Sequence, residues 1–412
     1  MSTGSCKYSR LIALRPAAGA PSREAQVSGA GTEGADRIAR LLEAEHHETE
    51  RGRHLVVRRR FPDLTESPVG PRAHRLLFPG GTQSTADPRN WIFLDTETTG
   101  LAGGTGTYAF LVGIAWWDGE GLAVEQYFMP DHSQEASMLV DLAGRLAGRP
   151  VLVTYNGKSF DCPLLETRFR MTRLGNMPSP EAHLDLLHPA RTIWKTRLRS
   201  VALAEIERHI LTLDRGPDIP AETIPGRYFA FLRGGPPEPL VEVFDHNAKD
   251  LHGMAVLALH IVQMLEEIAS ADGDSDQLYG MSRLLRIRGE QELALEFGER
   301  ALAKGLSGTA ALSARHELAL LSRRRRDYQG ASRHWGQLLG DSRVGMEAYE
   351  QLAIFYEHHS CDLEMAARFT REALVRLQDD YQSGRIPPHQ YRRLHAGFQH
   401  RLARLLRKSN SI

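Results

Sequence analysis

Residues 91–100 read WIFLDTETTG. The four apolar residues that open this stretch predict a buried β-strand. Asp95 and Glu97 are two positions apart, so in a strand their side chains point to the same face of the sheet. Two carboxylates this close repel each other unless a cation lies between them. The stretch therefore indicates a divalent metal site, and oxygen ligands favour Mg²⁺ or Mn²⁺. The alternative is an exposed edge strand with two hydrated acids, which the apolar run disfavours.

A second apolar stretch follows the same pattern and reads VLVTYNGKSFD at residues 151–161. Its opening residues predict another strand, and Asn156 with Gly157 predicts a turn. Asp161 then begins a helical pattern that continues through Phe169. An acid in this position has an alternative role, because it can cap the N-terminus of the helix.

The third acidic segment reads FDHNAKDL at residues 244–251 and begins a long helical pattern that continues to Met264. His246 and Asp250 are four residues apart, so they share one face of this helix. Taken alone, a histidine and an aspartate at this spacing are more often a surface contact than a catalytic pair.

Together the three segments resemble the DEDD exonucleases, a family with the ribonuclease-H-like fold. The first motif of that family, D-x-E, matches residues 95–97, and the second, N-x-x-x-F-D, matches residues 156–161. The third motif is Y-x-x-x-D or H-x-x-x-x-D, and this chain departs from both, because His246 stands at the tyrosine spacing. The glycine-rich residues 101–110 and the HLDLLH stretch at 183–188 are similar to a bacterial group of predicted exonucleases that carries tetratricopeptide-like repeats.

The resemblance implies a hydrolase, a 3′–5′ exonuclease that cleaves phosphodiester bonds of DNA or RNA by a two-metal mechanism with Mg²⁺ or Mn²⁺. Its metal ligands would be four carboxylates, those of Asp95, Glu97, Asp161 and Asp250. His246 would orient or deprotonate the attacking water. Four further positions would contact the terminal nucleotide of a single-stranded 3′ end: Thr98, Leu101, Asn156 and Phe160. Phe160 is equally consistent with an ordinary core position.

The composition gives no global signature of a nucleic-acid-binding protein. The 412 residues carry 51 basic and 51 acidic side chains, so any affinity for nucleic acid must come from local patches and should weaken with salt. One such patch surrounds Trp194 and consists of Arg191, Lys195, Arg197 and Arg199. It fits a groove that follows phosphates beside a stacking residue, or a hydrated helix face.

The cysteines and the hydropathy pattern bear on the compartment. The three cysteines, Cys6, Cys162 and Cys361, are far apart and suggest neither a disulfide framework nor a zinc site. They fit a reducing cytosol, so a cytoplasmic location is expected. No apolar run approaches the roughly 18 residues that a membrane span needs, so we expect no membrane partner.

Composition and periodicity divide the chain into five segments, as expected for two or three domains. They are a disordered N-terminus at 1–33, an N-terminal extension at 34–89, an exonuclease domain at 90–270, helical repeats at 276–380 and a basic C-terminal helix or tail at 381–412. A short helix is expected near residues 35–42. The catalytic segment runs strand, hairpin, helix, strand and further helices. This order predicts an α/β ribonuclease-H-like mixed sheet with helices on both faces.

A weak internal repeat marks the helical segment. Ala294, Ala331 and Ala366 are 37 and 35 residues apart by subtraction, close to the 34-residue tetratricopeptide period, although the full consensus is absent. About three hairpins should stack into a small solenoid that binds a protein partner, supports the nuclease domain or dimerises. The basic tail could meet nucleic acid or an acidic partner surface, or close the end of the solenoid.

The main alternative to an exonuclease is a catalytically weak or inactive adaptor that binds nucleic acid or protein partners through its repeats. All four carboxylates are present, and an adaptor has no physical need of them, so the enzyme is favoured. Endonucleolytic cleavage on the same fold is a third possibility, against which the N-x-x-x-F-D motif and the helical third motif argue.

Overall fold

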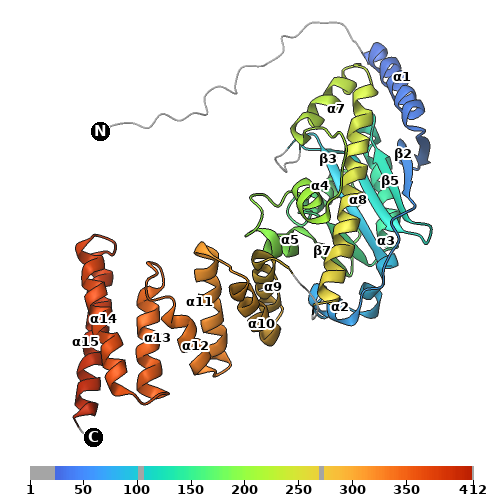
Figure 1. Ribbon diagram of the computed structural model, residues 1–412. Coiled ribbons are helices and arrows are strands. Elements are labelled where there is room, and N and C mark those ends of the chain that lie inside the picture. The colour runs from blue at the N-terminus through green and yellow to red at the C-terminus, as the bar shows by residue number, and fades with distance from the viewer. Residues whose placement is uncertain (1–23, 101–105, 269–272, 411–412) are drawn as a thin grey trace, which may run out of the picture.

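The computed structural model describes residues 24–100, 106–268 and 273–410. Residues 1–23, which make up most of the segment expected to be disordered, and Leu101 lie outside the described residues. The described chain forms an α/β domain followed by an all-helical region (Figure 1).

Seven strands of the described chain form one sheet in the order β1-β2-β5-β4-β3-β6-β7. They are β1 (Glu45–Thr49), β2 (Gly52–Phe61), β3 (Trp91–Thr98), β4 (Ala109–Trp117), β5 (Leu122–Phe128), β6 (Val151–Thr154) and β7 (Ala182–Asp185). The pairs from β1 to β3 are antiparallel, whereas β6 pairs in parallel with both β3 and β7. The predicted mixed sheet is therefore confirmed.

Helices flank both faces of this sheet (Figure 1). They are α1 (Glu24–Leu42), α2 (Pro71–Leu77), α3 (Glu135–Ala147), α4 (Asp161–Met171), α5 (Leu187–Trp194), α6 (Leu203–Ile206), α7 (Ile224–Leu232) and α8 (Glu238–Glu266). A π-helical turn, Glu207–Leu211, follows α6. Helix α1 begins well before the expected start at residue 35, so it extends into the segment that was expected to be disordered.

Alternate residues of β3 enter two different cores. Trp91 and Phe93 pack with residues of α2, α5 and the second half of α8, whereas Ile92 and Leu94 pack with residues of α3, α4 and α7. All four side chains are almost fully buried, and each such burial contributes about 1.5–3 kcal/mol. This alternation fixes the face of the sheet on which Asp95 and Glu97 lie.

A glycine in β4 lets helix α8 lie close to the sheet. Gly113 pairs with Asp95 across the β3–β4 ladder. A Cβ atom at Gly113 would lie 2.1 Å from Oδ1 of Asn247 and 2.8 Å from Cδ1 of Leu251. A larger residue at this position would therefore push away the part of α8 that carries the third acidic segment.

The all-helical region extends away from the sheet as a row of antiparallel helices (Figure 1). It comprises α9 (Ser275–Ile287), α10 (Gln291–Ala303), α11 (Gly308–Arg324), α12 (Tyr328–Gly336), α13 (Gly345–His358), α14 (Leu363–Gln382) and α15 (Pro388–Ser409). The first helix, α9, packs against α5 of the α/β domain. The helical character predicted for this part of the chain is confirmed.

Three helical hairpins of this region share one turn geometry. The alanines that mark the sequence repeat lie in α10, α12 and α14, the second helix of each hairpin, and all three are buried. The residue five positions before each alanine has a positive φ: 83° at Gly289, 64° at Arg326 and 58° at Cys361. The repeat is therefore also present in the backbone, at the same spacing.

The basic tail packs against its own chain. Helix α15 covers the end of the row, where Arg401, Arg404 and Lys408 all contact the buried carboxylate of Glu357 in α13. This arrangement corresponds to the expected alternative in which the tail closes the helical row.

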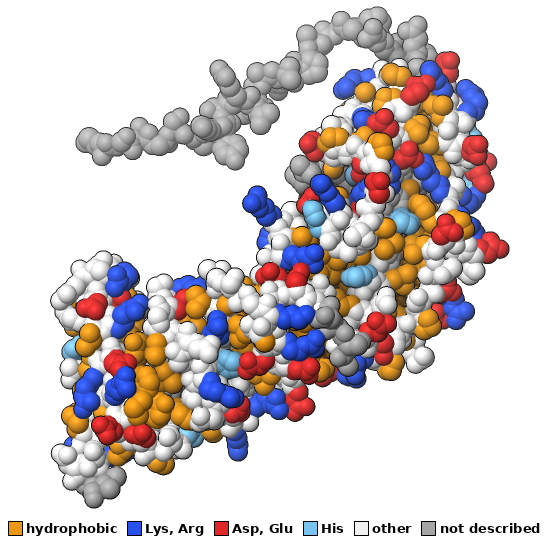
Figure 2. All heavy atoms as spheres, in the orientation of Figure 1, with side chains coloured by type: hydrophobic (Ala, Val, Ile, Leu, Met, Phe, Trp, Pro, Cys, Tyr) orange, Lys and Arg blue, Asp and Glu red, His pale blue; other side chains and the backbone are white. Residues whose placement is uncertain are grey.

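The surface carries both signs of charge. Figure 2 shows Lys and Arg side chains mixed with Asp and Glu side chains over the visible face, in keeping with the net charge of zero. Trp194 is completely buried, so the alternative in which it stacks on bases in a surface groove is wrong. Among the helices that the structure describes, none is long and apolar enough to cross a bilayer.

Candidate active site

Four of the acids singled out in the sequence lie near the carboxyl ends of strands β3 and β6, in the middle of the sheet. Asp95 and Glu97 lie near the end of β3, and Asp161 begins the helix that follows the neighbouring parallel strand β6. Asp250 reaches the same place from α8. Burial raises the pKa of Asp95, and the charges of Asp250 and Asp161 raise it further. Such mutual repulsion requires the carboxylates to be near neighbours.

Glu97 shares this environment. Its side chain is buried, which raises its pKa, and the charge of Asp95 is the next largest cause. A buried group of ionised carboxylates is unfavourable unless cations balance its charge. The donor set consists of oxygen atoms, which suits Mg²⁺ or Mn²⁺ better than softer ions. The residues therefore fit the divalent metals expected from the sequence.

A buried amide network fixes the orientation of Asp95. Asn247 donates from Nδ2 to Oδ2 of Asp95 at 2.8 Å, and its Oδ1 accepts a hydrogen bond from Nε2 of Gln126 at 2.9 Å. Gln126 also donates to the backbone oxygen of Phe244 at 2.8 Å. Both amides are completely buried. They tie β5, α8 and β3 together, and the sequence patterns did not single out either of them.

Asp161 does not cap its helix. Helix α4 begins at Asp161 itself, Phe160 occupies the cap position, and no side-chain cap hydrogen bond forms. The carboxylate instead accepts a hydrogen bond from the hydroxyl of Thr96 on β3. Burial raises the pKa of Asp161 as well. The capping alternative is therefore wrong, because the carboxylate bonds to β3 instead of to its own helix.

Asp185, at the end of β7, holds the loop that leads to Asp161. Its carboxylate accepts hydrogen bonds from the backbone N–H of Asn156 at 2.7 Å and of Lys158 at 3.1 Å. Asn156 has a φ of 69°, a left-handed conformation that asparagine tolerates better than most residues. A pocket of about 440 Å³ adjoins this loop and is lined in part by Lys158, His183 and Asp185.

The remaining sequence-predicted positions have different surroundings. Thr98 donates from its hydroxyl to the backbone oxygen of Gly100 at 3.0 Å. Phe160 is 58% exposed, so it is not a core residue. Leu101 lies outside the described residues. Thr98, Asn156 and Phe160 all lie on the segments that carry the acids.

His246 lies between two carboxylates. Its Nδ1 is 2.8 Å from Oδ1 of Asp218, and its Nε2 is 3.7 Å from Oδ2 of Asp250. Asp218 comes from the proline- and glycine-rich segment before α7, and no sequence motif singled it out. The contact with Asp218 fixes the ring orientation and leaves Nε2 on the side of the acid cluster.

Arg215 supplies a positive charge to the acids in the structure. Its guanidinium donates to Asp250, lies 2.9 Å from Oε2 of Glu207 and 3.1 Å from Oδ2 of Asp218. Burial raises the pKa of Glu207 to about 7, against the attraction of Arg215. No three ligand atoms of the predicted metal ligands lie within 4.8 Å of one another. Arg215 and Glu207 carried no motif, so the sequence patterns missed them.

Two comparisons with known proteins bear on this site. Residues 92–262, which span β3 to most of α8 and include every acid described above, match the RNase_H superfamily. The chain is 30% identical over 288 residues to the uncharacterized protein YprB of Bacillus subtilis (strain 168), a match that covers 69% of each chain. Residues 92–262 therefore form a domain of the RNase_H superfamily, and the chain belongs to the same family as that Bacillus protein.

Proposed function

We propose that this protein is a metal-dependent 3′–5′ exonuclease of the DEDD type that hydrolyses phosphodiester bonds of DNA or RNA. Membership of the RNase_H superfamily suggests a nuclease, and these folds usually use divalent metals. The observation that carries the proposal is the cluster of buried acids around Asp95, whose pKa is raised by burial and by the charges of Asp250 and Asp161. Such a cluster stays ionised at neutral pH only if positive charges balance it, which divalent metal ions would do.

Hydrogen bonds within the chain orient two of the four proposed metal ligands. The ligands would be Asp95, Glu97, Asp161 and Asp250. Bound Mg²⁺ or Mn²⁺ ions would lower the pKa of a water molecule and balance the charge of the phosphate. Asn247 directs one oxygen of Asp95, and Thr96 directs one oxygen of Asp161, so two of the four carboxylates are oriented before any ion binds. Such preorganisation avoids reorganisation during the reaction.

His246 would be the general base. With Nδ1–H donating to Asp218, the lone pair of Nε2 is free to accept a proton from the attacking water. Replacing His246 by alanine should therefore slow hydrolysis by about 10²–10⁴-fold, the usual contribution of a positioned acid or base. Initial rates with and without the substitution measure this effect.

Two further variants make the test of His246 specific. His209→Ala is the control, because this exposed histidine pairs with Glu205 in the same helical segment and should leave the rate unchanged. Asp218→Asn should lower the rate by about 10–100-fold, as expected for a partner that orients a functional histidine. Full activity of His246→Ala would mean that another group accepts the proton.

The substrate would be a single-stranded 3′ end. Phe160 exposes its ring beside Asp161, where it can stack on a base, and such stacking contributes about 1–3 kcal/mol. Thr98, Leu101 and Asn156 are the other proposed contacts to the terminal nucleotide. Lys158 lines the adjoining pocket and would attract the phosphate backbone.

The helical region would form tetratricopeptide-like repeats that bind a protein partner. The shared turn geometry at Gly289, Arg326 and Cys361 supports a repeated unit. We accordingly propose a nuclease domain at 90–270, an N-terminal extension at 34–89, repeats at 276–380 and a closing segment at 381–412. Stacked repeats of this kind leave an extended surface on one side, which suits a peptide.

One observation favours the alternative adaptor without efficient catalysis. The guanidinium of Arg215 pairs with Asp250, so it competes with a metal ion for that carboxylate. In an active enzyme Arg215 would release Asp250 and bind the substrate phosphate. An adaptor would keep the pair and would bind nucleic acid or protein without cleaving it.

A degradation assay distinguishes the exonuclease from the adaptor. The purified full chain would be incubated with Mn²⁺ and 5′-labelled single-stranded DNA or RNA. A ladder that shortens from the 3′ end supports the exonuclease and identifies the sugar that it accepts. Internal cuts would instead indicate an endonuclease, and binding without cleavage would support the adaptor.

The stabilisation of the folded chain by bound metal ions should depend on pH. A carboxyl group whose pKa is raised by folding binds more protons in the folded state than in the unfolded state at pH values above about 4, the pKa in the unfolded chain. Folding therefore becomes less favourable as the pH rises through this range. Asp95, Glu97 and Asp161 are all of this kind. Millimolar Mn²⁺ should therefore raise the melting temperature more at pH 7 than at pH 5.

Thermal melts of the full chain, with and without Mn²⁺ at each pH, measure this difference. Asp95→Asn is the comparison, because it removes one of the repelling charges. The variant should be more stable than the unsubstituted chain without metal at pH 7 and should gain less from Mn²⁺. An equal gain in both proteins at both pH values would contradict a metal site at these acids.

A further inference from the structure

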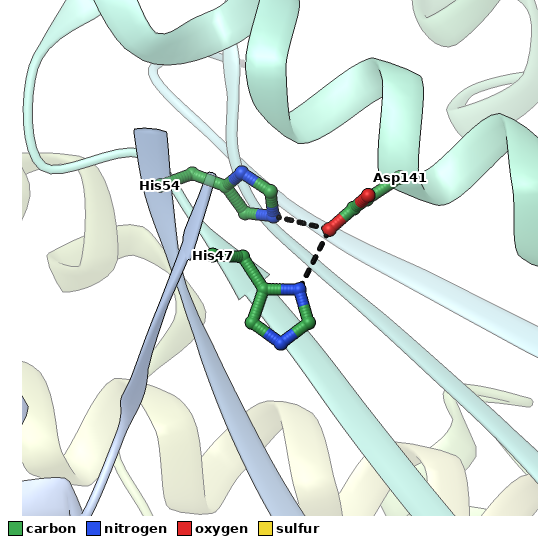
Figure 3. A group of neighbouring side chains, drawn as sticks. All are labelled: His47, His54 and Asp141. Carbon is green, nitrogen blue, oxygen red and sulfur yellow. Dashed lines mark hydrogen bonds and ion pairs between the residues drawn. The ribbon is translucent and has the colours of Figure 1, made fainter. Parts of the chain in front are cut away.

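Two histidines and an aspartate converge beside the β1–β2 hairpin (Figure 3). Strands β5 and β4 separate this hairpin from β3, which carries Asp95 and Glu97. His47 on β1 and His54 on β2 are directly paired across the first hairpin. Both rings point at Asp141 of α3, with Nδ1 of His47 2.8 Å and Nε2 of His54 3.2 Å from the same oxygen, Oδ2. Within the described residues this is the one group of His, Cys, Asp or Glu whose three ligand atoms all lie within 4.8 Å of one another.

The protons around His54 leave a lone pair that faces this carboxylate. Ser137 donates its hydroxyl proton to the backbone oxygen of Gly52 at 2.8 Å, and the same hydroxyl lies 2.9 Å from Nδ1 of His54. With the single hydroxyl proton on the Gly52 oxygen, which can only accept, Nδ1 of His54 is the donor in that contact. In a neutral ring Nε2 then carries a lone pair.

That nitrogen is buried without a hydrogen-bond partner, although the carboxylate oxygen is near. Its side chain is completely inaccessible to solvent, and such burial disfavours a doubly protonated ring. A lone pair and a carboxylate oxygen at 3.2 Å repel each other unless a cation lies between them. The site thus contains an unpaired buried donor atom for a metal.

His47 is arranged to contribute the second nitrogen. Its Nε2 lies 3.5 Å from the carboxylate of Glu45 and 3.1 Å from Nη2 of Arg58. Because a guanidinium can only donate, Nε2 accepts from Arg58 in this structure and Nδ1 holds the proton that faces Asp141. Binding of a cation at Nδ1 would move the ring proton to Nε2, where Arg58 would turn away and Glu45 would accept the proton. A histidine that binds metal with one nitrogen commonly donates from the other to a carboxylate or hydroxyl, and both rings have such partners here.

We propose that His47 Nδ1, His54 Nε2 and the carboxylate of Asp141 bind one divalent transition-metal ion of the Zn²⁺ type, with water as a fourth ligand. Two imidazoles and a carboxylate suit Zn²⁺ better than Mg²⁺ or Ca²⁺, which prefer oxygen. Metal–ligand distances of about 2.0–2.1 Å give a tetrahedron with edges of about 3.3 Å. The two nitrogen-to-oxygen distances of 2.8 and 3.2 Å are close to such edges.

The role of this ion would be structural. The β1–β2 hairpin precedes residues 92–262, the part that matches the superfamily, and it forms one edge of the sheet. An ion held by His47, His54 and Asp141 would fasten both strands of that hairpin to α3. It would therefore stabilise the edge of the sheet without taking part in hydrolysis.

Metal content of the full chain tests the proposal. Each protein would carry Asp95→Asn, so that the acid cluster is weakened and the site can be tested independently of the proposed nuclease function. Metals are removed by chelation, and each protein is then reloaded with Zn²⁺ and desalted. Elemental analysis should find about one more Zn²⁺ per chain in the Asp95→Asn protein than in the same protein with His47→Gln or Asp141→Asn added. Both added substitutions conserve side-chain size at partly exposed positions.

His46→Gln is the matched control, because this neighbouring histidine is more exposed and pairs with Asp36 at 3.5 Å rather than with Asp141. It should retain the ion. Titration should show that His47→Gln weakens Zn²⁺ binding by more than about 100-fold, beyond the 10–100-fold loss typical of a partner outside the coordination sphere. Zn²⁺ should also raise the melting temperature of the control but not of His47→Gln.

The proposal would be overturned if the control protein held no more Zn²⁺ than His47→Gln and Asp141→Asn. Circular dichroism establishes that each variant is folded. If His47→Gln fails to fold, Asp141→Asn alone decides, because its substitution removes a ligand oxygen from the helix rather than from the hairpin. Equal Zn²⁺ binding by Asp141→Asn and by the control would then place the ion elsewhere and contradict the proposal.

Discussion

Replacing Asp95 by asparagine should lower the nuclease activity by at least about 10³-fold. The substitution keeps the size of the side chain and its contact with Asn247, but it removes one negative charge from the proposed metal ligands. Metal ions contribute several kcal/mol of transition-state stabilisation in such sites. Since each 1.36 kcal/mol corresponds to a factor of ten in rate, the loss of about 4 kcal/mol gives this magnitude. Initial rates of 3′ shortening with Mn²⁺ and a 5′-labelled oligonucleotide measure it.

Asp245→Asn is the matched control for this experiment. Asp245 precedes the proposed base in the same helix, but its side chain is 44% exposed and pairs with Arg59 at 2.6 Å, away from the acid cluster. The same chemical change at this position should leave the rate within about twofold, since surface pairs contribute little. If folded Asp95→Asn kept more than a tenth of the activity, the four acids could not be the metal ligands.

The sequence predicted the strands of the sheet well because consecutive residues of each strand show its pattern of burial. Trp91 to Leu94 are all buried, and a continuous apolar run is what a strand covered on both faces requires. The hairpin expected after this strand is likewise present, formed by β4 and β5. In both cases the residues that identify the strand in the sequence are also the residues that make its contacts in the fold.

Strand β1 could not be predicted in this way. Its sequence, EHHET, has no apolar residue, and it exists because its backbone pairs with β2 at the edge of the sheet. Its second histidine, His47, points toward Asp141, which is 94 residues away along the chain. An edge strand of this kind depends on tertiary contacts that no local periodicity reveals.

The acids of the candidate site were found from motifs, whereas the groups that orient them were not. Asn247 lies inside the third acidic segment, but its role depends on Gln126 in β5 and on Gly113 opposite Asp95. Asp218 and Arg215 approach from a segment without periodicity. Their roles follow from three-dimensional proximity, so only the structure could identify them.

The second large effect concerns the end of the helical row. Glu357→Gln should destabilise the packing of α15 by about 2–3 kcal/mol. The carboxylate is completely buried and receives hydrogen bonds from Arg401, Arg404 and Lys408. Breaking a buried ion pair typically costs about 3–5 kcal/mol, because a charge loses its partner. The effect should be smaller here, since Arg404 and Lys408 remain partly in water.

Hydrogen exchange of the amides in α15 measures this local stability, and 2–3 kcal/mol corresponds to roughly 30–150-fold faster exchange. Glu350→Gln is the control on the same helix, because its half-exposed carboxylate lies 3.7 Å from Arg401 and should change the stability by less than 1 kcal/mol. Equal exchange in the two variants would mean that Glu357 does not hold α15.

The contribution of Glu357 should also depend on pH. Burial by itself would raise its pKa, but the hydrogen bonds and charges of Lys408 and Arg404 outweigh burial and lower the pKa to about 2. An unfolded glutamate has a pKa of about 4.3, so the unfolded state takes up a proton first as the pH falls. The stabilisation is therefore complete above pH 5 and is lost between about pH 4 and pH 2. Protection of α15 in the unsubstituted chain should fall in that window, while Glu357→Gln, which has no carboxyl group to titrate at this position, should lose less.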